Sequence, residues 1–151
     1  MAKIKKVQYL VIHHAASSKT TTIEDIRKWH KDKGWTDIGY HKVIYIDGTV
    51  KQGREDSVIG SQAFGANAVS LGICLIGNYD LHKPSEEIIK SLVQVLAILC
   101  KRHNLTVDKI IGHCQVAKMF NAPAGASGCP GKYLIALLPE IREKVKKYLL
   151  P

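Results

Sequence analysis

The sequence predicts a mixed α/β fold, a single domain with a central mixed β-sheet flanked by helices. Short apolar runs of the length of buried strands, such as residues 7–14 and 70–78, alternate with longer segments in which apolar residues recur at the helical period. The 151 residues contain no internal repeat, low-complexity tract or linker-like segment, and a chain of this length can bury a full core. We therefore expect one domain over residues 1–151.

The first strand and the first helix are predicted within residues 7–14 and 22–34. The run "VQYLVIHH" is rich in β-branched and aromatic residues and is short enough to be a buried strand. After it, Thr21 and Glu24 have the three-residue spacing of a capping box, and Gly34 suits the C-terminal cap of a helix. The segment "TIEDIRKWHKDKG" is therefore expected to be helical.

A hairpin and a second apolar strand follow. Residues 40–53, "YHKVIYIDGTVKQG", contain Asp47 and Gly48, a pair that favours a two-residue hairpin turn. Residues 70–78, "SLGICLIGN", form another apolar run, which a glycine and an asparagine end. Both segments are expected to supply strands to the sheet.

The second half opens with the clearest helix in the sequence, which begins after Ser85. Ser85 is a good N-cap residue, acidic side chains follow it, and basic side chains end the segment, as the helix dipole favours. The apolar side chains that follow the helical period predict its buried face: Ile88, Ile89, Leu92, Val93, Leu96, Leu99 and Cys100.

The remaining segments are predicted as a short strand, a loop and a final helix. Residues 109–114 are the strand, residues 121–131 are a loop of small residues, and residues 133–150 are the helix. Pro139 lies inside this last segment and is expected to restart or kink the helix.

The composition narrows the possible partners and the redox state. The net charge of +9 favours a polyanionic partner, such as nucleic acid, anionic lipid or an anionic cell-wall polymer, although a lysine-rich solubilising surface explains it equally well. No stretch is long and apolar enough to span a membrane, and the apolar run near the basic start is too short for a secretion signal. We therefore expect synthesis in a reducing cytosol, where the four cysteines are thiols or metal ligands and not disulfides.

Three good zinc ligands stand where a strand gives way to a loop: His13, His113 and Cys129. Catalytic zinc commonly takes three protein ligands and keeps a fourth position for water, whereas structural zinc usually uses close ligand pairs, which this sequence lacks. The pattern favours an open catalytic site, with a buried core role as the alternative for each residue. Strand alternation alone does not separate His13 from His14, or His113 from Cys114, because both faces of such strands can be buried.

Several motifs occur in the order seen in type 2 N-acetylmuramoyl-L-alanine amidases. They are "VIHHAAS", "IRKWHKDKGWTDIGYHKVIYIDGTV", "SLGICLIGN", "IIGHC" and "GCPG". The sequence most resembles the compact amidase-type lysozymes (endolysins) of T-odd phages, and peptidoglycan recognition proteins share the same plan. The resemblance runs from about residue 9 to residue 133, and residues 26–50 are its most specific part.

The resemblance implies roles for particular residues. His13, His113 and Cys129 would be the zinc ligands, Tyr40 the catalytic hydroxyl, and His41 a residue that lines the site. A zinc ion with three protein ligands can lower the pKa of its water to about 7 and polarise the amide carbonyl. A neutral tyrosine hydroxyl can stabilise the oxyanion that develops, an effect typically worth about 3 kcal/mol.

Two positions depart from the phage enzymes that the sequence resembles. Ser127 stands where those enzymes carry a catalytic lysine, so a neutral hydroxyl replaces a positive charge; recognition proteins carry a threonine there. Gln62 stands where they carry a histidine, so contacts with substrate are expected to differ. We place catalytic roles at Tyr40 and Ser127 and substrate contacts at His41, Gln62 and Asn67.

The resemblance implies zinc-dependent hydrolysis of the amide bond between N-acetylmuramic acid and L-alanine in bacterial peptidoglycan. Because no export signal is evident, we expect a bacteriolytic phage or prophage endolysin. We also expect it to be a monomer. It would be made in the host cytoplasm and act at the cell wall, without nucleic acid or membrane insertion; a bacterial autolysin or recycling enzyme is the alternative setting.

Two other classes of function remain as alternatives. The first is a non-catalytic peptidoglycan-binding module on the same fold, and the presence of Cys129 and Tyr40 argues against it. The second is a basic nucleic-acid-binding protein, for which the sequence offers neither a recognition motif nor a pattern of stacking aromatic residues.

Overall fold

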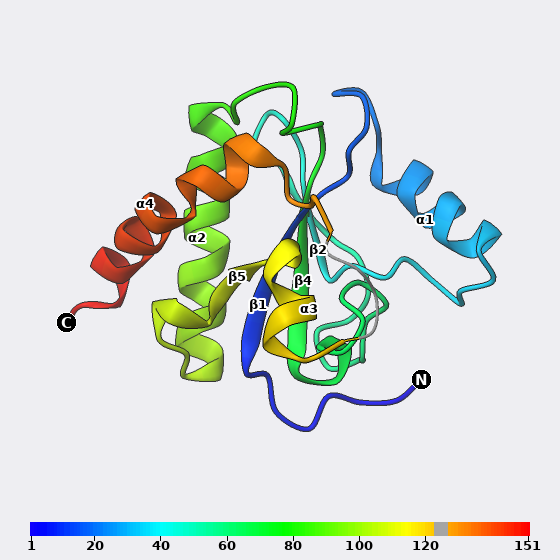
Figure 1. Ribbon diagram of the computed structural model, residues 1–151, viewed down its shortest axis with the longest axis horizontal. Helices are drawn as coiled ribbons and strands as arrows, with labels where there is room; N and C mark the ends of the chain where they lie inside the picture. The colour runs from blue at the N-terminus through cyan, green and yellow to red at the C-terminus, as the bar shows by residue number, and fades with distance from the viewer. Residues whose placement is uncertain (123–126) are drawn as a thin grey trace.

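The computed structural model describes residues 1–122 and 127–151, and at its centre lies a five-stranded sheet with the order β3-β2-β4-β1-β5 (Figure 1). The strands are β1 (Tyr9–His14), β2 (Lys42–Ile44), β3 (Val50–Gln52), β4 (Ser70–Leu75) and β5 (Ile110–Gly112). β1 pairs in parallel with β4 and β5, β2 pairs in parallel with β4, and β3 is antiparallel to β2. The mixed sheet expected from the sequence is confirmed.

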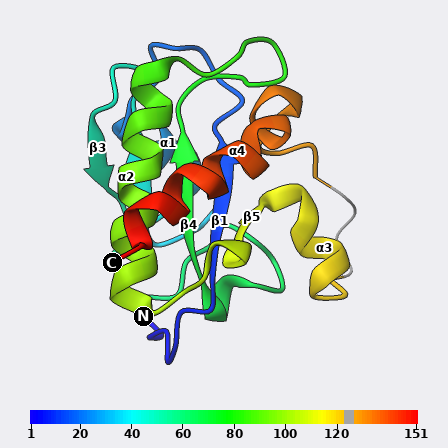
Figure 2. The same cartoon turned by 90° about the vertical axis from the view of Figure 1, so that its left-hand side faces the viewer.

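Helices cover both faces of this sheet. They are α1 (Ile23–Asp32), α2 (Glu86–His103), α3 (Val116–Met119) and α4 (Lys132–Leu149). α2 and α4 pack together on one face, and α1 lies on the other (Figures 1 and 2). In the part of the chain that the structure describes, no helix has both the length and the apolar character needed to cross a membrane.

The side chains of β1 and β4 alternate between the two faces of the sheet. Leu10 and Ile12 of β1 lie with Leu71 and Ile73 of β4 in the large core beneath α2 and α4. Val11 belongs to a separate cluster on the opposite face, as the two-residue period of a strand requires. Neighbouring residues at the end of β1 therefore point to opposite faces.

The capping box of α1 lies one residue later than the sequence suggested. Thr22 Oγ1 accepts a hydrogen bond from the Asp25 N–H (3.2 Å), and Asp25 Oδ2 accepts one from the Thr22 N–H (2.9 Å). The pair Thr21 and Glu24 has the same spacing, so local sequence did not separate the two possibilities. With Thr22 as the cap, Ile23 opens the helix and lies in the core, at 4% exposure.

The β2–β3 hairpin closes with a three-residue loop, residues 46–48, and not with the expected two-residue turn. The Tyr45 N–H donates to the Thr49 carbonyl (2.8 Å), and the Gly48 N–H donates to the Tyr45 carbonyl (2.8 Å). Gly48 has φ +89°, the left-handed conformation that ends such loops in a bulge. Asp47 Oδ1 accepts from the Thr49 N–H (2.9 Å), which fixes the loop.

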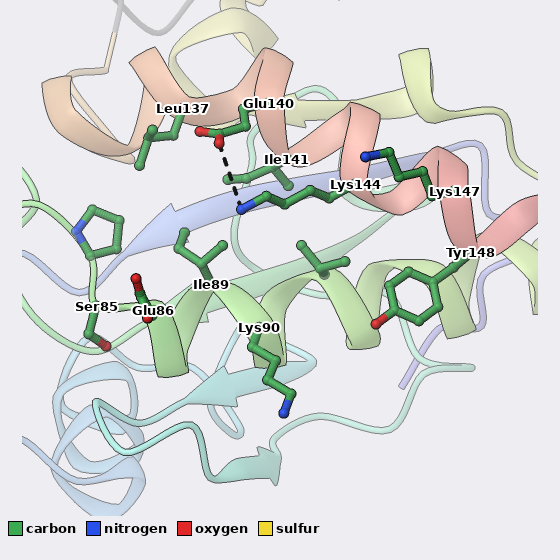
Figure 3. A pocket seen from close by; sticks show the side chains of 12 residues that line it. Ser85, Glu86, Ile89, Lys90, Leu137, Glu140, Ile141, Lys144, Lys147 and Tyr148 are labelled. Carbon is green, nitrogen blue, oxygen red and sulfur yellow. Dashed lines mark ion pairs between the residues drawn. The ribbon is translucent and has the colours of Figure 1, made fainter.

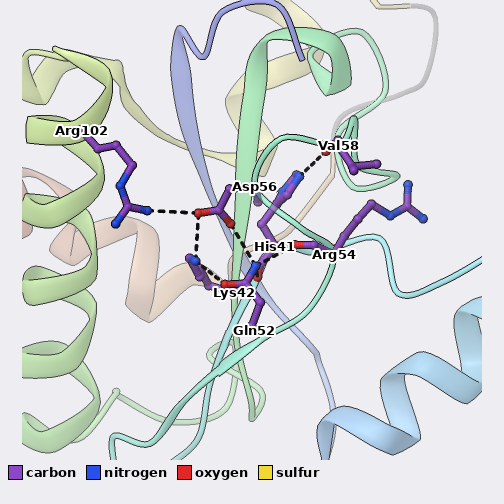
Figure 4. A network of polar contacts seen from close by, with 8 residues as sticks. His41, Lys42, Gln52, Arg54, Asp56, Val58 and Arg102 are labelled. Atoms are coloured by element: carbon purple, nitrogen blue, oxygen red, sulfur yellow. Dashed lines mark hydrogen bonds and ion pairs between the residues drawn. The ribbon is translucent and has the colours of Figure 1, made fainter. Parts of the chain in front are cut away.

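A polar network joins this hairpin to α2 through Asp56 (Figure 4). The Asp56 carboxylate accepts hydrogen bonds from Lys42 of β2 (3.0 Å) and Gln52 of β3 (3.0 Å). Arg102 of α2 lies 3.4 Å from the same carboxylate. Burial raises the pKa of Asp56, but the hydrogen bonds from Gln52 and Lys42 outweigh this effect and hold the pKa below its ordinary value.

The long helices of the second half match their predictions in most respects. Ser85 Oγ accepts from the Ile88 N–H (3.2 Å) and caps α2 as expected. α4 runs through Pro139 as one helix, so this proline does not restart it. Leu138 and Ile141, on either side of Pro139, are buried in the main core, so both halves of α4 pack against it.

The segment before α4 contains a short helix and part of the predicted loop. The short helix α3 was not predicted, because four residues carry too little periodicity to be recognised. The loop predicted over residues 121–131 includes residues 123–126, which lie outside the described residues.

Candidate metal centre

His13 and His14 have different surroundings because they lie on opposite faces of β1. His13 shares the face of Val11, and its side chain is 1% exposed. On the other face, His14 Nδ1 accepts a hydrogen bond from the Tyr79 N–H (3.0 Å), and burial lowers the pKa of this imidazole. The main-chain N–H of His14 donates to Cys129 Sγ (3.3 Å). The ring of His13, and not that of His14, faces the thiol.

His13, His113 and Cys129 form a cluster whose ligand atoms all lie within 4.8 Å of one another. His13 Nδ1 is 3.6 Å from Cys129 Sγ, and the ring centroids of His13 and His113 are 4.6 Å apart. Zinc binds imidazole nitrogen and thiolate sulfur at about 2.0–2.3 Å, so ligand atoms on one zinc ion lie within a few ångströms of one another, as these do. Two imidazoles and one thiol are a donor set that suits a zinc site with one position left open.

Three separate segments supply the members of this cluster. His113 begins a short 3₁₀ turn, His113–Gln115, directly after β5, which pairs with β1. This turn replaces the end of the strand predicted over residues 109–114. The direction of the His113 side chain therefore does not follow from the alternation of side chains along a strand. Cys129 stands shortly before α4, and the Cys114 N–H donates to the Cys129 carbonyl (2.7 Å). Cys114 therefore supports the cluster through its main chain.

Ser127 and Cys129 are connected by a hydrogen bond within the last ligand segment. Ser127 Oγ accepts from the Cys129 N–H (3.0 Å), so the Ser127 hydroxyl proton stays available to another partner. Burial raises the pKa of the Cys129 thiol to about 12. A buried thiolate at this position would need a nearby cation to balance its charge.

Tyr40 stands beside the cluster, and α1 holds the turn that presents it. The Tyr40 ring centroid is 5.0 Å from that of His13 and 5.3 Å from that of His30. Burial raises the pKa of Tyr40 well above its ordinary value, so its hydroxyl is a neutral donor at neutral pH. His30 Nδ1 accepts from the Gly39 N–H (2.8 Å), and burial lowers the pKa of His30 to about 4. This role of His30 is not predictable from local sequence, because its partner Gly39 lies outside α1.

A cleft of about 540 Å³ opens over the cluster. Its lining comes from the end of α1 and the turn after it, from the 61–67 loop, and from His113 of the cluster with the nearby Ser127: His30, Lys33, Trp35, Tyr40, Ser61, Gln62, Ala63, Phe64, Asn67, His113 and Ser127. Lys33 Nζ lies 5.1 Å from the centre of the Trp35 ring, and Phe64 is 62% exposed. The cleft thus offers aromatic surfaces and an ammonium group next to the cluster.

A second groove, of about 510 Å³, lies between α2 and α4 (Figure 3). Ile89, Leu137 and Ile141 line it, beside an ion pair between Glu140 and Lys144 (3.7 Å). None of the described residues that line it is a histidine or a cysteine. α2 and α4 cover the face of the sheet opposite to His13, so this groove is separate from the cluster.

The structure corrects the expectation that His41 contacts substrate. His41 is fully buried and does not line the cleft. Its Nδ1 accepts from the Gly72 N–H (3.0 Å), and its Nε2 donates to the Val58 carbonyl (2.8 Å; Figure 4). Burial also lowers its pKa, so the ring is neutral. Both ring nitrogens are engaged inside the fold, where they connect β4 to the segment after the hairpin.

Gln62 and Asn67 line the cleft, and both make hydrogen bonds within the protein. Asn67 Oδ1 accepts from the main-chain N–H groups of Gln62 (2.9 Å) and Ala63 (2.8 Å). Gln62 Oε1 lies 2.6 Å from His13 Nε2. A contact of Gln62 with a member of the cluster was not predicted; substrate contacts at Gln62 and Asn67 stay predictions.

Comparison with known proteins identifies the class of protein that this fold and site belong to. A family model described as N-acetylmuramoyl-L-alanine amidase matches residues 3–132, and the chain belongs to this family. The solved structure of the N-acetylmuramoyl-L-alanine amidase LysC from Clostridium intestinale URNW superposes with a TM-score of 0.82 and 28% identity, covering 97% of this chain and 93% of that one.

The particular relatives include both phage and animal proteins. The endolysin of Klebsiella phage KP32 is 30% identical over 131 residues, which cover 85% of this chain and 83% of that protein. Peptidoglycan-recognition protein SC2 of Drosophila melanogaster is 33% identical over 134 residues, covering 83% of this chain and 68% of that protein. The resemblance seen in the sequence is confirmed, and the chain is an amidase.

Proposed function

We propose that this amidase uses zinc to hydrolyse the amide bond between N-acetylmuramic acid and L-alanine in bacterial peptidoglycan, as a phage or prophage endolysin. The observation that carries the proposal is the cluster of His13, His113 and Cys129, whose ligand atoms lie within 4.8 Å of one another beneath a cleft. We further propose that residues 1–151 act as one catalytic domain and as a monomer.

The three members of the cluster would hold the metal. Two neutral imidazoles and a thiolate are ligands that Zn²⁺ prefers, and they leave one position for a small molecule. When bound, zinc supplies a water of lowered pKa and a Lewis acid for the amide carbonyl. Burial lowers the pKa of His113 and brings that of His13 to about 3, so both imidazoles are neutral and ready to bind.

Tyr40 supplies a neutral hydrogen-bond donor beside the cluster. Its ring lies 5.0 Å from that of His13, and it lines the cleft. As the carbonyl carbon is attacked, negative charge develops on the carbonyl oxygen, and a donor held in place stabilises that charge. The raised pKa of Tyr40 keeps the proton on the hydroxyl and so keeps this donor at neutral pH.

Ser127 is proposed to donate a second, weaker hydrogen bond to substrate. Its oxygen already accepts from the Cys129 N–H (3.0 Å), which leaves its proton for a group in the cleft that it lines. A neutral hydroxyl binds a developing anion less strongly than an ammonium does, because charge-assisted hydrogen bonds are roughly twice as strong.

One assay tests the proposed chemistry. The purified chain is incubated with isolated peptidoglycan, and free amino groups and reducing sugar ends are measured. We expect new amino groups, loss of activity on chelation, and recovery on adding zinc. Reducing ends would indicate a glycosidase, and activity that survives complete chelation would exclude a metal role.

The same assay addresses the remaining alternatives. Binding to peptidoglycan with no release of amino groups would favour a binding module, the role suggested by the likeness to a peptidoglycan-recognition protein. An endolysin should also lyse permeabilised bacteria; release from isolated peptidoglycan without lysis would instead favour a recycling enzyme.

A further inference from the structure

A chain of buried hydrogen bonds runs from the loop before β4 to the cluster of His13, His113 and Cys129. The Ser70 hydroxyl donates to the Ala66 carbonyl (2.7 Å). The Gln62 amide nitrogen donates to the Ser70 oxygen (2.8 Å), and Gln62 Oε1 lies 2.6 Å from His13 Nε2. Ser70, Gln62 and His13 are 0%, 9% and 1% exposed, so each group depends on the next for its hydrogen bond.

The chemistry of these groups gives the chain of hydrogen bonds a single direction. The Ala66 carbonyl can only accept, so the single proton of the Ser70 hydroxyl is directed to it. The Ser70 oxygen is then an acceptor, and the NH₂ of Gln62 must face it. This orientation turns Gln62 Oε1 toward His13, and because Oε1 has no proton to give, His13 must carry its proton on Nε2.

We propose that Gln62 is a positioning residue that holds His13 in the Nε2–H tautomer, with Nδ1 as its metal-binding atom. The inference rests on the proposed zinc site and adds a determinant of it. His13 Nδ1 is the nitrogen 3.6 Å from Cys129 Sγ, so its lone pair faces the cluster. A neutral imidazole binds a metal through the nitrogen that lacks a proton, and the partner of the other nitrogen selects which one that is.

The protein is built to hold the Gln62 side chain in this place. A Cβ at Gly72 in the middle of β4 would lie 2.7 Å from Gln62 Cγ and Cδ, and a Cβ at Gly60 would lie 3.2 Å from Gln62 Cγ. Asn67 Oδ1 binds the main-chain N–H of Gln62 (2.9 Å). Glycine weakens the interior of a strand and often marks a place where another group approaches closely. At Gly72 that group is the Gln62 side chain, which occupies the space where a Cβ would lie.

The first test requires neither metal nor activity. In zinc-free protein labelled with ¹⁵N-histidine, ¹H–¹⁵N spectra report which ring nitrogen of His13 carries the proton. We expect the Nε2–H pattern in the wild type and a mixture of tautomers in Gln62→Met, which keeps the side-chain length and removes both hydrogen bonds. A wild-type Nδ1–H tautomer, or an unchanged pattern in Gln62→Met, overturns the inference.

The second test measures zinc affinity by competition with a chromophoric chelator. Loss of the hydrogen-bond partner of a metal-binding histidine typically weakens binding about 10–100-fold, and we expect a loss of this size in Gln62→Met. Gln62→Glu retains an acceptor oxygen for His13 and should bind zinc with most of the wild-type affinity. Gln94→Met, at an exposed glutamine of α2, is the matched control and should bind zinc like the wild type.

The outcomes separate this inference from the proposed function. If the wild type binds no zinc, the proposed function fails, and the spectra still decide the role of Gln62. If folded Gln62→Met binds zinc as tightly as the wild type, the role of Gln62 fails and the zinc site stands. Should Gln62→Met not fold, Ser70→Ala frees the amide to rotate; weaker zinc binding supports the inference, and unchanged binding overturns it.

Discussion

At the scale of single residues, the adjacent histidines of β1 show how one strand separates two tasks. The ring of His13 faces Cys129 Sγ at 3.6 Å, whereas the ring of His14 accepts the Tyr79 N–H on the other face. A side chain on a strand changes face at every residue, so this division follows from the position of the strand in the sheet. The two histidines should therefore respond differently to metal removal and to mutation.

We expect about one zinc ion per chain, and each member of the cluster to be essential for binding it. His13→Ala, His113→Ala and Cys129→Ala should each lose zinc and activity, because three ligands leave no spare one. Metal content after dialysis measures this loss. Cys114→Ala and Cys74→Ala are the matched thiol controls and should keep zinc. Zinc retained in Cys129→Ala but lost in Cys114→Ala would mean that the wrong thiol was assigned.

Tyr40→Phe tests the proposed donor with almost no change in packing. The fold and the zinc content should survive, and turnover should fall by about two orders of magnitude or more if the hydroxyl stabilises the oxyanion. Amino-group release at saturating peptidoglycan, compared with zinc content of the same sample, is the measurement. Unchanged turnover would leave Tyr40 as a packing residue beside His13 and His30.

Ser127 provides a graded comparison with Tyr40. Ser127→Ala should slow turnover less than Tyr40→Phe does, with zinc still bound, because the aliphatic hydroxyl of serine is a weaker hydrogen-bond donor than the more acidic phenol of Tyr40. Ser127→Lys should keep or raise activity, since it adds a charge that favours the developing anion. A folded, zinc-loaded and inactive Ser127→Lys protein would argue that Ser127 is packed against the site and does not contact substrate.

At the scale of secondary-structure elements, contacts between elements hold the site more than any single helix or strand does. His30 of α1 binds the Gly39 N–H next to Tyr40, and His41 connects β4 to the segment that contains Val58. Asp56 joins the hairpin to α2 in the same way. These polar contacts cross between elements, and the buried ones are costly to break.

The contribution of Asp56 to stability should depend on pH. Its pKa is below the ordinary value in the folded protein, so the carboxylate stabilises the fold at neutral pH, and this contribution is lost as the pH falls below about 4. Asp56→Asn should lower the free energy of unfolding by about 1–2 kcal/mol at pH 7, because Lys42 and Gln52 lose a charged partner.

Urea unfolding at pH 7 and near pH 3 measures this difference. The difference in the free energy of unfolding between wild type and Asp56→Asn should narrow at the lower pH, because the unfolded chain then binds a proton at Asp56 that the folded protein resists. Asp32→Asn is a suitable control, because Asp32 pairs with Lys28 on the exposed surface of α1 and such pairs contribute little. An equal gap at both pH values would show that charge is not the source of the effect.

At the scale of the whole molecule, the proposed zinc site joins three parts of the fold. His13 ends β1, His113 follows β5, and Cys129 precedes α4, so a bound ion would restrain segments far apart in the chain. Anything that binds the folded state and not the unfolded state stabilises it, by about 2.7 kcal/mol when the ligand is at 100 times its Kd. Zinc should therefore act on the stability of the entire chain.

We expect chelation to lower the Tm of the wild-type protein by several degrees and zinc to restore it. Cys129→Ala should show no such response, because it lacks one of the three ligands. Thermal unfolding followed by circular dichroism, with and without chelator, measures both. A Tm of the wild type that does not respond to chelation would contradict a zinc site in the folded protein.

The sequence by itself determined the class of fold and the position of its most periodic elements. The apolar residues of α2 recur at the helical period over five turns, and "VQYLVIHH" has the length and composition of a buried strand. The pattern of apolar residues alone therefore identifies this helix and this strand. The members of the cluster could also be named, because their motifs match a known family.

Only the tertiary structure decided which atoms meet. Local sequence predicted a capping box at Thr21, a two-residue hairpin turn and a substrate role for His41, and the structure differs at each of these places. Gln62 was expected to contact substrate, and the structure shows that its side-chain amide also forms a hydrogen bond with His13, 49 positions away in the chain. Periodicity reports which side chains are buried, whereas hydrogen-bond partners across separate elements depend on the packing of the entire sheet.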